Sequence, residues 1–184
     1  MASQEVIKIL RSILTLQLAS FVLVTFSFYL AISTYPALPH TFPVHFDLSG
    51  TPNRWEMKSW IDVLRLPLIQ LGAFVFTTAL TFWCVYSPRS LAYLNLPKID
   101  NIKMLKLSDE KQGEIRLLSA VFISMITLFI SFLFTIINYQ LLQAETTGRN
   151  GSPIWIVVVI VISLLGSFIS VKKLTSAIKH ISGQ

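Results

Sequence analysis

Four stretches of the chain contain no Asp, Glu, Lys or Arg, and each is long enough to cross a membrane as a helix. A membrane-spanning helix needs about 20 mostly apolar residues to cross a hydrocarbon core roughly 30 Å thick. Helices are the expected form because backbone groups in lipid must be satisfied within their own segment, and alternating barrel strands of about ten residues are absent. The uncharged stretches are residues 13–33, 66–87, 117–144 and 153–171.

The third helix is expected to begin before its uncharged stretch. Ser108 can cap a helix, and Asp109 and Glu110 would lie in its first turn, where carboxylates favour the positive helix end. The sequence therefore predicts an all-α integral membrane protein, a bundle of four transmembrane helices with a small extracytoplasmic loop subdomain between the first two. We expect one membrane domain over residues 1–184, with helices at about 13–33, 66–87, 109–143 and 153–172, an outer loop at 34–65 and a basic inner loop at 88–108.

Lysine and arginine are unevenly distributed among the segments that join the predicted helices. Cytoplasmic segments of membrane proteins carry an excess of these residues. Placing both termini in the cytoplasm leaves only Arg54, Lys58, Arg65 and Arg149 outside. We therefore expect a multi-pass protein of the cell (plasma) membrane with cytoplasmic N- and C-termini. The basic residues on the inner side are then Lys8, Arg11, Arg89, Lys98, Lys103, Lys106, Lys111, Arg116, Lys172, Lys173 and Lys179.

Composition supports the bilayer as the solvent. The chain is 53% hydrophobic and 13% charged, whereas soluble domains average about 25% charged residues. A formal charge of +6 in a soluble protein would suggest nucleic acid, but here the basic residues lie between apolar runs, so we expect no nucleic-acid partner. Cys84, the one cysteine, excludes a disulfide within the chain. The run 13–33 exceeds the 7–15 apolar residues of a signal peptide, which favours an uncleaved first helix.

The predicted spans offer little ionisable chemistry. They carry no ionisable residue apart from Cys84 and tyrosines, whereas ion-coupled transport usually uses buried charged or histidine side chains. Asn138 and Gln140 are expected to hydrogen-bond between helices. Hydroxyl residues spaced by four favour close packing within the bundle, and a homo-oligomer interface stays an open alternative. An example is the row Thr127, Ser131 and Thr135.

The outer loop is the most informative segment. In residues 41–47, Phe42 and Val44 alternate with His45 and Asp47, which predicts a strand with aromatic and polar faces. Turn-forming residues follow at 49–53. If residues 59–65 are helical, Trp60, Ile61 and Leu64 share a face that could lie on the membrane surface.

Several interpretations of this loop remain open. It can be a structural cap, in which aromatics pack on the helices while Asp47 and Arg54 or Asn53 hold the turn. It can be a recognition surface, because Trp55 and Trp60 lie beside Arg54 and Lys58, and Trp and Arg are enriched in binding hot spots. A metal site would use His40, His45 and Asp47.

Catalysis with His45 as a base is the least supported interpretation. The chain has no paired nucleophile near it, and the G-x-S-x-G and H-E-x-x-H motifs are absent. We therefore predict neither an enzyme nor a cofactor. Two other roles stay open beside recognition: a small transporter or membrane-complex subunit, and a membrane metalloprotein.

Residues 38–59, LPHTFPVHFDLSGTPNRWEMKS, resemble the signature of a small bacterial membrane domain of unknown function. That domain is found at the N-terminus of Sdp-type toxin immunity proteins, and this chain resembles its short, stand-alone members. Asn53 stands where the signature usually has Asp; a turn-forming role suits both residues. The matching residues are Leu38, Pro39, Pro43, His45, Phe46, Gly50, Pro52, Trp55, Lys58 and Ser59.

The resemblance implies a non-enzymatic protein that recognises a secreted peptide toxin or another extracytoplasmic partner, with the lipid bilayer around its helices. Candidate binding residues follow from the signature and the recognition interpretation together. They are Pro39, Pro43, His45, Phe46, Asp47, Gly50, Pro52, Asn53, Arg54, Trp55 and Lys58.

Overall fold

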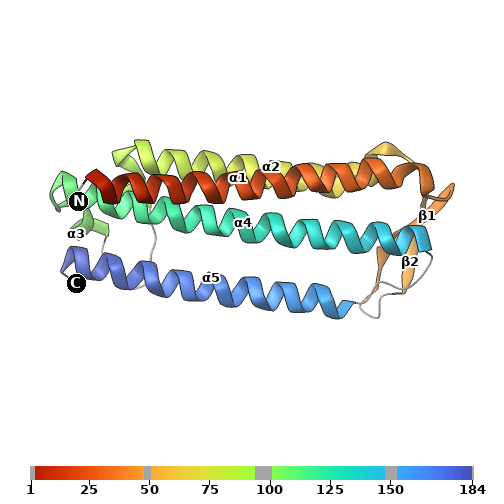
Figure 1. Cartoon of the computed structure of the whole chain (residues 1–184). Helices are drawn as coiled ribbons and strands as arrows, with labels where there is room; N and C mark the ends of the chain where they lie inside the picture. Colours follow the sequence, from red (N-terminus) through yellow and green to blue (C-terminus); the bar gives the residue numbers. More distant parts are fainter. Residues whose placement is uncertain (1–2, 48–50, 94–100, 148–152, 184) are drawn as a thin grey trace. The chain divides into compact units, whose positions relative to one another are not determined.

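A computed structural model describes residues 3–47, 51–93, 101–147 and 153–183 (Figure 1). Four of its helices are long and apolar enough to cross a membrane, which confirms the predicted all-α membrane fold. Along the chain, a two-stranded antiparallel sheet lies between the first two of these helices. In chain order the elements are α1 Ser3–Thr34, η1 Tyr35–Ala37, β1 Thr41–Phe46, β2 Pro52–Met57, α2 Trp60–Tyr86, η2 Pro88–Tyr93, α3 Asn101–Leu105, α4 Asp109–Thr147 and α5 Pro153–Ser182.

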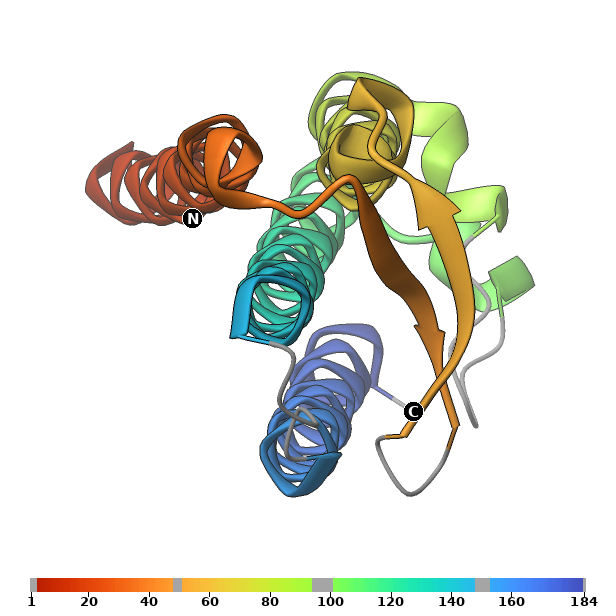
Figure 2. The ribbon, with the colours of Figure 1, turned by 90° about the vertical axis from the view of Figure 1, so that its right-hand side faces the viewer.

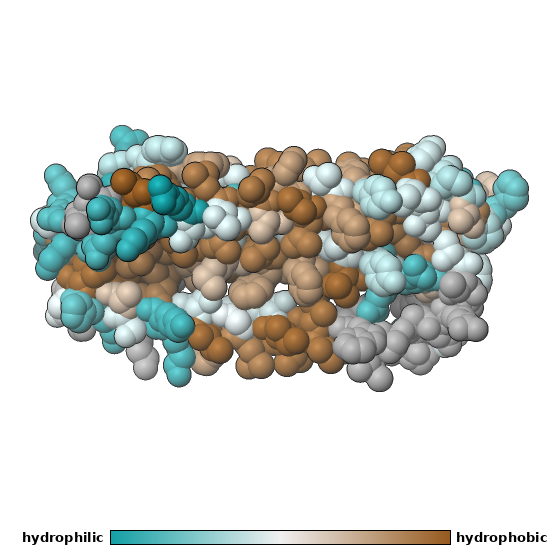
Figure 3. Space-filling model, in the orientation of Figure 1, coloured by the Kyte–Doolittle hydropathy of each residue, from teal (hydrophilic) through white to brown (hydrophobic). Residues whose placement is uncertain are grey.

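All four long helices extend beyond the uncharged stretches. Helix α1 begins at Ser3 and α2 at Trp60, several residues before their uncharged stretches begin, and α5 continues to Ser182. Charged residues do not interrupt a helix; they mark where it leaves the hydrocarbon. Figure 3 shows hydrophobic residues over much of the visible helix surface and hydrophilic residues near the hairpin and near α3.

The chain divides into two compact units. The first, the termini unit, consists of Met1–Ala19, Val75–Leu128 and Leu164–Gln184. One of its cores joins Ile13, Cys84 and Ala120 of three helices. A second core anchors the basic segment between α2 and α4 through apolar residues. Its buried members are Leu91, Met104, Ile115, Leu174 and Ile178.

The second unit, the hairpin unit, consists of Ser20–Phe74 and Phe129–Ser163. Its core brings Ala31 of α1, Val63 of α2 and Leu142 of α4 together with two residues from the hairpin side, Leu38 and Phe42. Phe42 is only 1% exposed. The strands β1 and β2 lie beyond the ends of α1 and α2 (Figure 2), and Phe42 anchors them to the helices.

Helix α4 buries a stripe of small and polar residues. Thr127, Ser131 and Thr135, the row spaced by four, are all buried within the chain. This agrees with the predicted packing inside the bundle; a homo-oligomer interface stays a prediction. The same stripe includes Ala120, Ser124, Asn138 and Leu142.

Candidate functional site

The outer loop forms a β-hairpin with two irregularities. Strand β1 occupies Thr41–Phe46, as the alternating pattern predicted, but β2 at Pro52–Met57 was not foreseen. Pro43 pairs with Trp55, yet His45 pairs with Arg54, so one residue of β1 is extra at this point. A second shift follows, because Phe46 pairs with Pro52. Bulges of this kind re-aim side chains.

The pairing gives the hairpin an inner and an outer face. Residues directly opposite each other in an antiparallel pair point to the same face, and neighbours along a strand point to opposite faces. Phe42 is buried against the helices, so its partner Glu56 also lies on the inner face. Trp55 and Met57 lie on the outer face, while Arg54 shares the inner face with Glu56. The predicted recognition surface of Arg54 and Trp55 is therefore divided between two faces.

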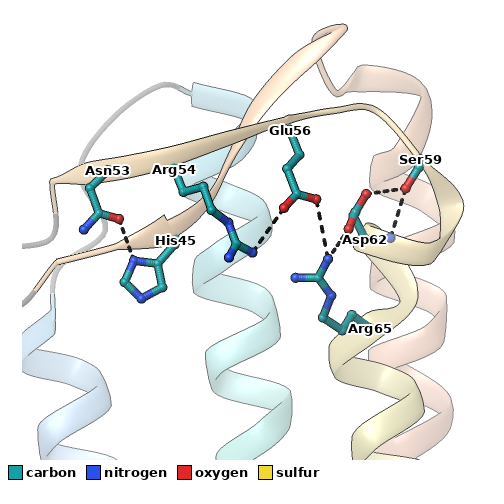
Figure 4. Close-up of polar contacts among 7 residues, drawn as sticks. All are labelled: His45, Asn53, Arg54, Glu56, Ser59, Asp62 and Arg65. Carbon is teal, nitrogen blue, oxygen red and sulfur yellow. Dashed lines mark hydrogen bonds and ion pairs between the residues drawn. The ribbon is translucent and has the colours of Figure 1, made fainter.

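His45 and Asn53 form a polar pair near the hairpin tip. The Nδ1 atom of His45 lies 2.5 Å from Oδ1 of Asn53 and donates to it in the tautomer that carries the proton on Nδ1. Figure 4 shows both side chains on the side of the hairpin that faces the helix ends. The register of Thr41–Met57 and Pro43–Trp55 would by itself place His45 opposite Asn53. The extra residue in each strand pairs His45 with Arg54 instead, and His45 still reaches the neighbouring Asn53.

Asp47 closes the turn that follows β1. Its Oδ1 accepts a hydrogen bond from the Thr51 backbone N–H at 2.9 Å, and its own N–H donates to the Thr51 carbonyl at 2.9 Å. Asp47 thus holds the turn, as the structural-cap interpretation predicted; of the two residues expected to help it, Arg54 contacts Glu56 and Asn53 contacts His45. Gly50, which lies between Asp47 and Thr51 in the sequence, is outside the described residues.

Charged side chains connect β2 to the start of α2 (Figure 4). Glu56 lies 3.1 Å from Arg54 and 3.6 Å from Arg65 through its two carboxylate oxygens. Arg65 also pairs with Asp62. Ser59 caps the helix: its Oγ accepts from the Asp62 N–H at 3.2 Å and donates to the Asp62 carboxylate. The Ser59-x-x-Asp62 pattern is a helix-start signal present in the sequence that the prediction of a helix at 66–87 did not use.

Lys58 joins the segment that leaves α1 to the segment that enters α2. Its Nζ donates to the Leu38 carbonyl at 3.0 Å and to the Pro36 carbonyl at 3.4 Å. It also lies 4.7 Å from the centre of the Tyr35 ring, which stacks on Trp60. A half-buried lysine with these partners makes structural contacts, and its part in a recognition surface stays a prediction.

The outer face of the hairpin presents large apolar side chains to the surroundings. Trp55 is 55% exposed and Met57 is 81% exposed. Pro43 is buried opposite Trp55, where cross-strand side chains approach closely. Ile61 is also exposed, whereas Leu64 packs toward the core of the hairpin unit. Residues 60, 61 and 64 therefore do not form one surface-lying face.

The remaining predicted site residues have mixed outcomes. Pro39 lies in the connection between η1 and β1, Phe46 ends β1 and Pro52 begins β2. Within the described ranges, no three His, Cys, Asp or Glu side chains gather closely enough to share a metal ion. The alternative of a metal site at His40, His45 and Asp47 therefore has no geometric support.

Sequence reasoning missed Glu56, Arg65 and Met57. Glu56 contacts Arg54, two positions earlier on the same face of β2, and Arg65 reaches Glu56 from α2. The alternation of polar and apolar residues over 53–57 was the available signal for β2, and it is short.

Buried amides connect the long helices. In the termini unit, Gln17 donates to Thr81 and Ser124 at 3.2 Å each and accepts from Thr78 at 2.8 Å. In the hairpin unit, Asn138 donates to the Ser27 carbonyl at 3.0 Å, which confirms the interhelical bond predicted for it. These amides serve packing, and their geometry adds no support for the transporter alternative.

Gln140, also predicted to bond between helices, has a buried Oε1 without a hydrogen-bond partner among the described residues, and so has Gln70. The Nε2 of Gln70 donates to the Ser131 carbonyl at 3.0 Å and to Thr135 Oγ1 at 3.1 Å. Its Oε1 is buried and has no hydrogen-bond partner in the part of the chain that the structure describes. Half of this amide is therefore unsatisfied.

Residues 22–71 match the family model of a domain of unknown function, DUF1648. The match covers the second part of α1, the hairpin and the first part of α2, so it contains the whole candidate site. No curated protein and no solved structure matches the chain. The family description assigns no activity.

Proposed function

We propose that this chain is a non-enzymatic protein of the bacterial plasma membrane that recognises a secreted peptide at the extracytoplasmic side. The observation that carries the proposal is the exposure of Trp55 and Met57 on the outer face of a hairpin whose base is held rigid. Exposed aromatic and methionine side chains on a fixed support are typical of binding surfaces. Neither side chain belongs to the described apolar core of the hairpin unit.

The rigidity of the support comes from two sets of contacts. Lys58 joins both ends of the hairpin through carbonyls of the preceding segment. Glu56 joins β2 to Arg65 of α2. A surface that is ordered before binding loses less entropy when a partner docks.

The extracytoplasmic location follows from the Lys and Arg distribution, which favours the hairpin outside and both termini inside. Toxin immunity is the specific form of recognition that the signature at residues 38–59 suggests. The Asp of that signature is Asn53 here, and Asn53 keeps the accepting oxygen that His45 uses. An uncharged residue therefore suffices for the hairpin tip.

The test is protection of cells that lack the gene. Complemented strains would carry the native gene, Trp55→Ala, or the control Tyr86→Ala. The control trims an exposed aromatic side chain of α2, outside the hairpin. The probe is the peptide fraction of the host's own stationary-phase medium. We expect the native and Tyr86→Ala strains to grow and the Trp55→Ala and deletion strains to be inhibited. Equal growth of all four strains would refute the proposal.

A further inference from the structure

The hairpin has one strand edge able to accept another strand. The Lys58 N–H donates to the His40 carbonyl at 2.8 Å, one step before the Thr41–Met57 pair. Hydrogen-bonded and non-hydrogen-bonded pairs alternate along an antiparallel ladder. Phe42 and Glu56 are therefore the next hydrogen-bonded pair. The backbone groups of Trp55 and Met57 consequently point away from β1.

Those outward groups take part in no backbone hydrogen bond with the described residues. Trp55 and Met57 make no backbone hydrogen bond to the described residues outside their own strand pair. Their side chains are also the exposed ones of the outer face. Unpaired N–H and C=O groups in a row are a template for an added strand.

The opposite edge of the sheet is blocked. On β1 the backbone groups of Pro43 point away from β2, and proline has no N–H to donate to an added strand. Pro43 and Phe42 are also buried, whereas β2 is exposed along Asn53–Trp55. Of the two edges, β2 is therefore the one that is exposed and offers both N–H and C=O groups at its outward positions, Trp55 and Met57.

We propose that the β2 edge binds an extended peptide by strand addition, with apolar residues opposite Trp55 and Met57 and an acidic residue opposite Arg54. The Arg54 side chain is 56% exposed and contacts Glu56 through one nitrogen, so its other donors can take a second carboxylate. This inference rests on the proposed function, since it specifies how the hairpin recognises its peptide.

The probe is a fluorescein-labelled eight-residue peptide with the central sequence Val-Thr-Val-Glu, measured by anisotropy against the full chain in lipid nanodiscs. In an antiparallel docking the two valines lie opposite Met57 and Trp55, with Thr opposite Glu56. Their amides would donate to β2, while the amide of the intervening threonine would face away. N-methylation of both valines should weaken binding about tenfold or more, and N-methylation of that threonine by less than about threefold.

Protein variants give an independent measurement. Met57→Pro removes one outward N–H without touching the bonds to β1, and Met57→Ala trims the side chain alone. We expect Met57→Pro to bind at least about fivefold more weakly than Met57→Ala. Replacing the peptide's Glu with Lys should weaken binding to the native protein and have little effect on an Arg54→Ala variant.

Two outcomes would overturn the strand-addition proposal. One is absence of binding by the unmodified peptide. The other is equal binding of the valine-methylated and threonine-methylated peptides. This comparison uses the native protein, so it does not depend on how any variant folds. Loss of cell protection in Trp55→Ala together with equal binding of those peptides would leave the recognition function standing and refute its mechanism. Strand addition in nanodiscs without any protection in cells would refute the recognition function alone.

Discussion

Lys58 shows how one side chain can hold a small motif together. Its ammonium contacts two carbonyls and one aromatic ring, all in residues 35–38, which lie some 20 positions earlier in the chain. Arg54, four positions away, instead contacts Glu56 on the inner face. Charge alone therefore does not assign a role; the strand register does.

Replacing Lys58 with Met should destabilise the protein by about 1–2 kcal/mol, because hydrogen bonds from a charged group are lost while the apolar stem is kept. The lower end of that range reflects partial exposure, which weakens such contacts. Thermal unfolding in detergent would measure the change. The control is Lys173→Met, at an exposed position of α5, which should leave the transition unchanged. Equal transitions for both variants would contradict the structural role of Lys58.

Asn53 supplies an acceptor and not a charge. Asn53→Asp should therefore keep the His45 contact, whereas Asn53→Ala should remove it and loosen the hairpin tip. Limited proteolysis of the hairpin would report the difference, with faster cleavage in the alanine variant alone. If the aspartate variant were cleaved as fast as the alanine variant, the contact would not be what orders the tip.

At the scale of elements, buried amides distinguish two kinds of helix contact. Gln17 satisfies both its donors and its acceptor between α1, α2 and α4. Gln70 has partners for Nε2 and none for Oε1. An unpaired buried oxygen carries a desolvation cost that offsets the hydrogen bonds of its own amide.

The two glutamines should respond differently to leucine. Gln17→Leu loses three hydrogen bonds, each contributing on average about 0.6 kcal/mol within a membrane, so a loss of about 2 kcal/mol is expected. Gln70→Leu loses two bonds and removes an unsatisfied oxygen, so its change should lie within about 0.5 kcal/mol of zero or be stabilising. Unfolding of both variants with increasing concentrations of a denaturing detergent would measure the two changes in stability. A larger loss for Gln70→Leu than for Gln17→Leu would contradict this account.

At the scale of the whole molecule, the distribution of Lys and Arg predicts the side of the membrane on which each helix end lies. The hairpin carries Arg54 and Lys58, whereas the segments around α3 and the end of α5 are richer in basic residues. The positive-inside tendency therefore favours an external hairpin. Every proposal about a secreted peptide depends on this orientation.

Cysteine labelling would measure the orientation directly. Met57→Cys should react with a membrane-impermeant maleimide in intact cells, and Lys173→Cys only after the cells are opened. Both positions are exposed, and Cys84 is buried, which keeps background labelling low. Labelling of position 173 and not 57 in intact cells would mean the opposite topology.

Local properties of the sequence were sufficient for the helices and for the first strand. Length and lack of charge identify a membrane helix within a single segment, and α1, α2, α4 and α5 were all predicted in this way. The alternation over residues 41–47 likewise predicted β1. The helix ends were placed too far inward because the charges mark the membrane boundary and not the end of the helix.

By itself the sequence determined that the chain crosses a membrane four times and carries a turn-rich segment after the first crossing, since these properties depend on residues close together in the chain. Tertiary structure decided that Arg54 and Trp55 face opposite ways, that His45 meets Asn53 and that Lys58 bonds to carbonyls near α1. Each of these contacts depends on how β1 and β2 pair. An extra residue in each strand pairs His45 with Arg54, where the register of the first three pairs alone would have paired it with Asn53, and the local sequence pattern carries no record of this change.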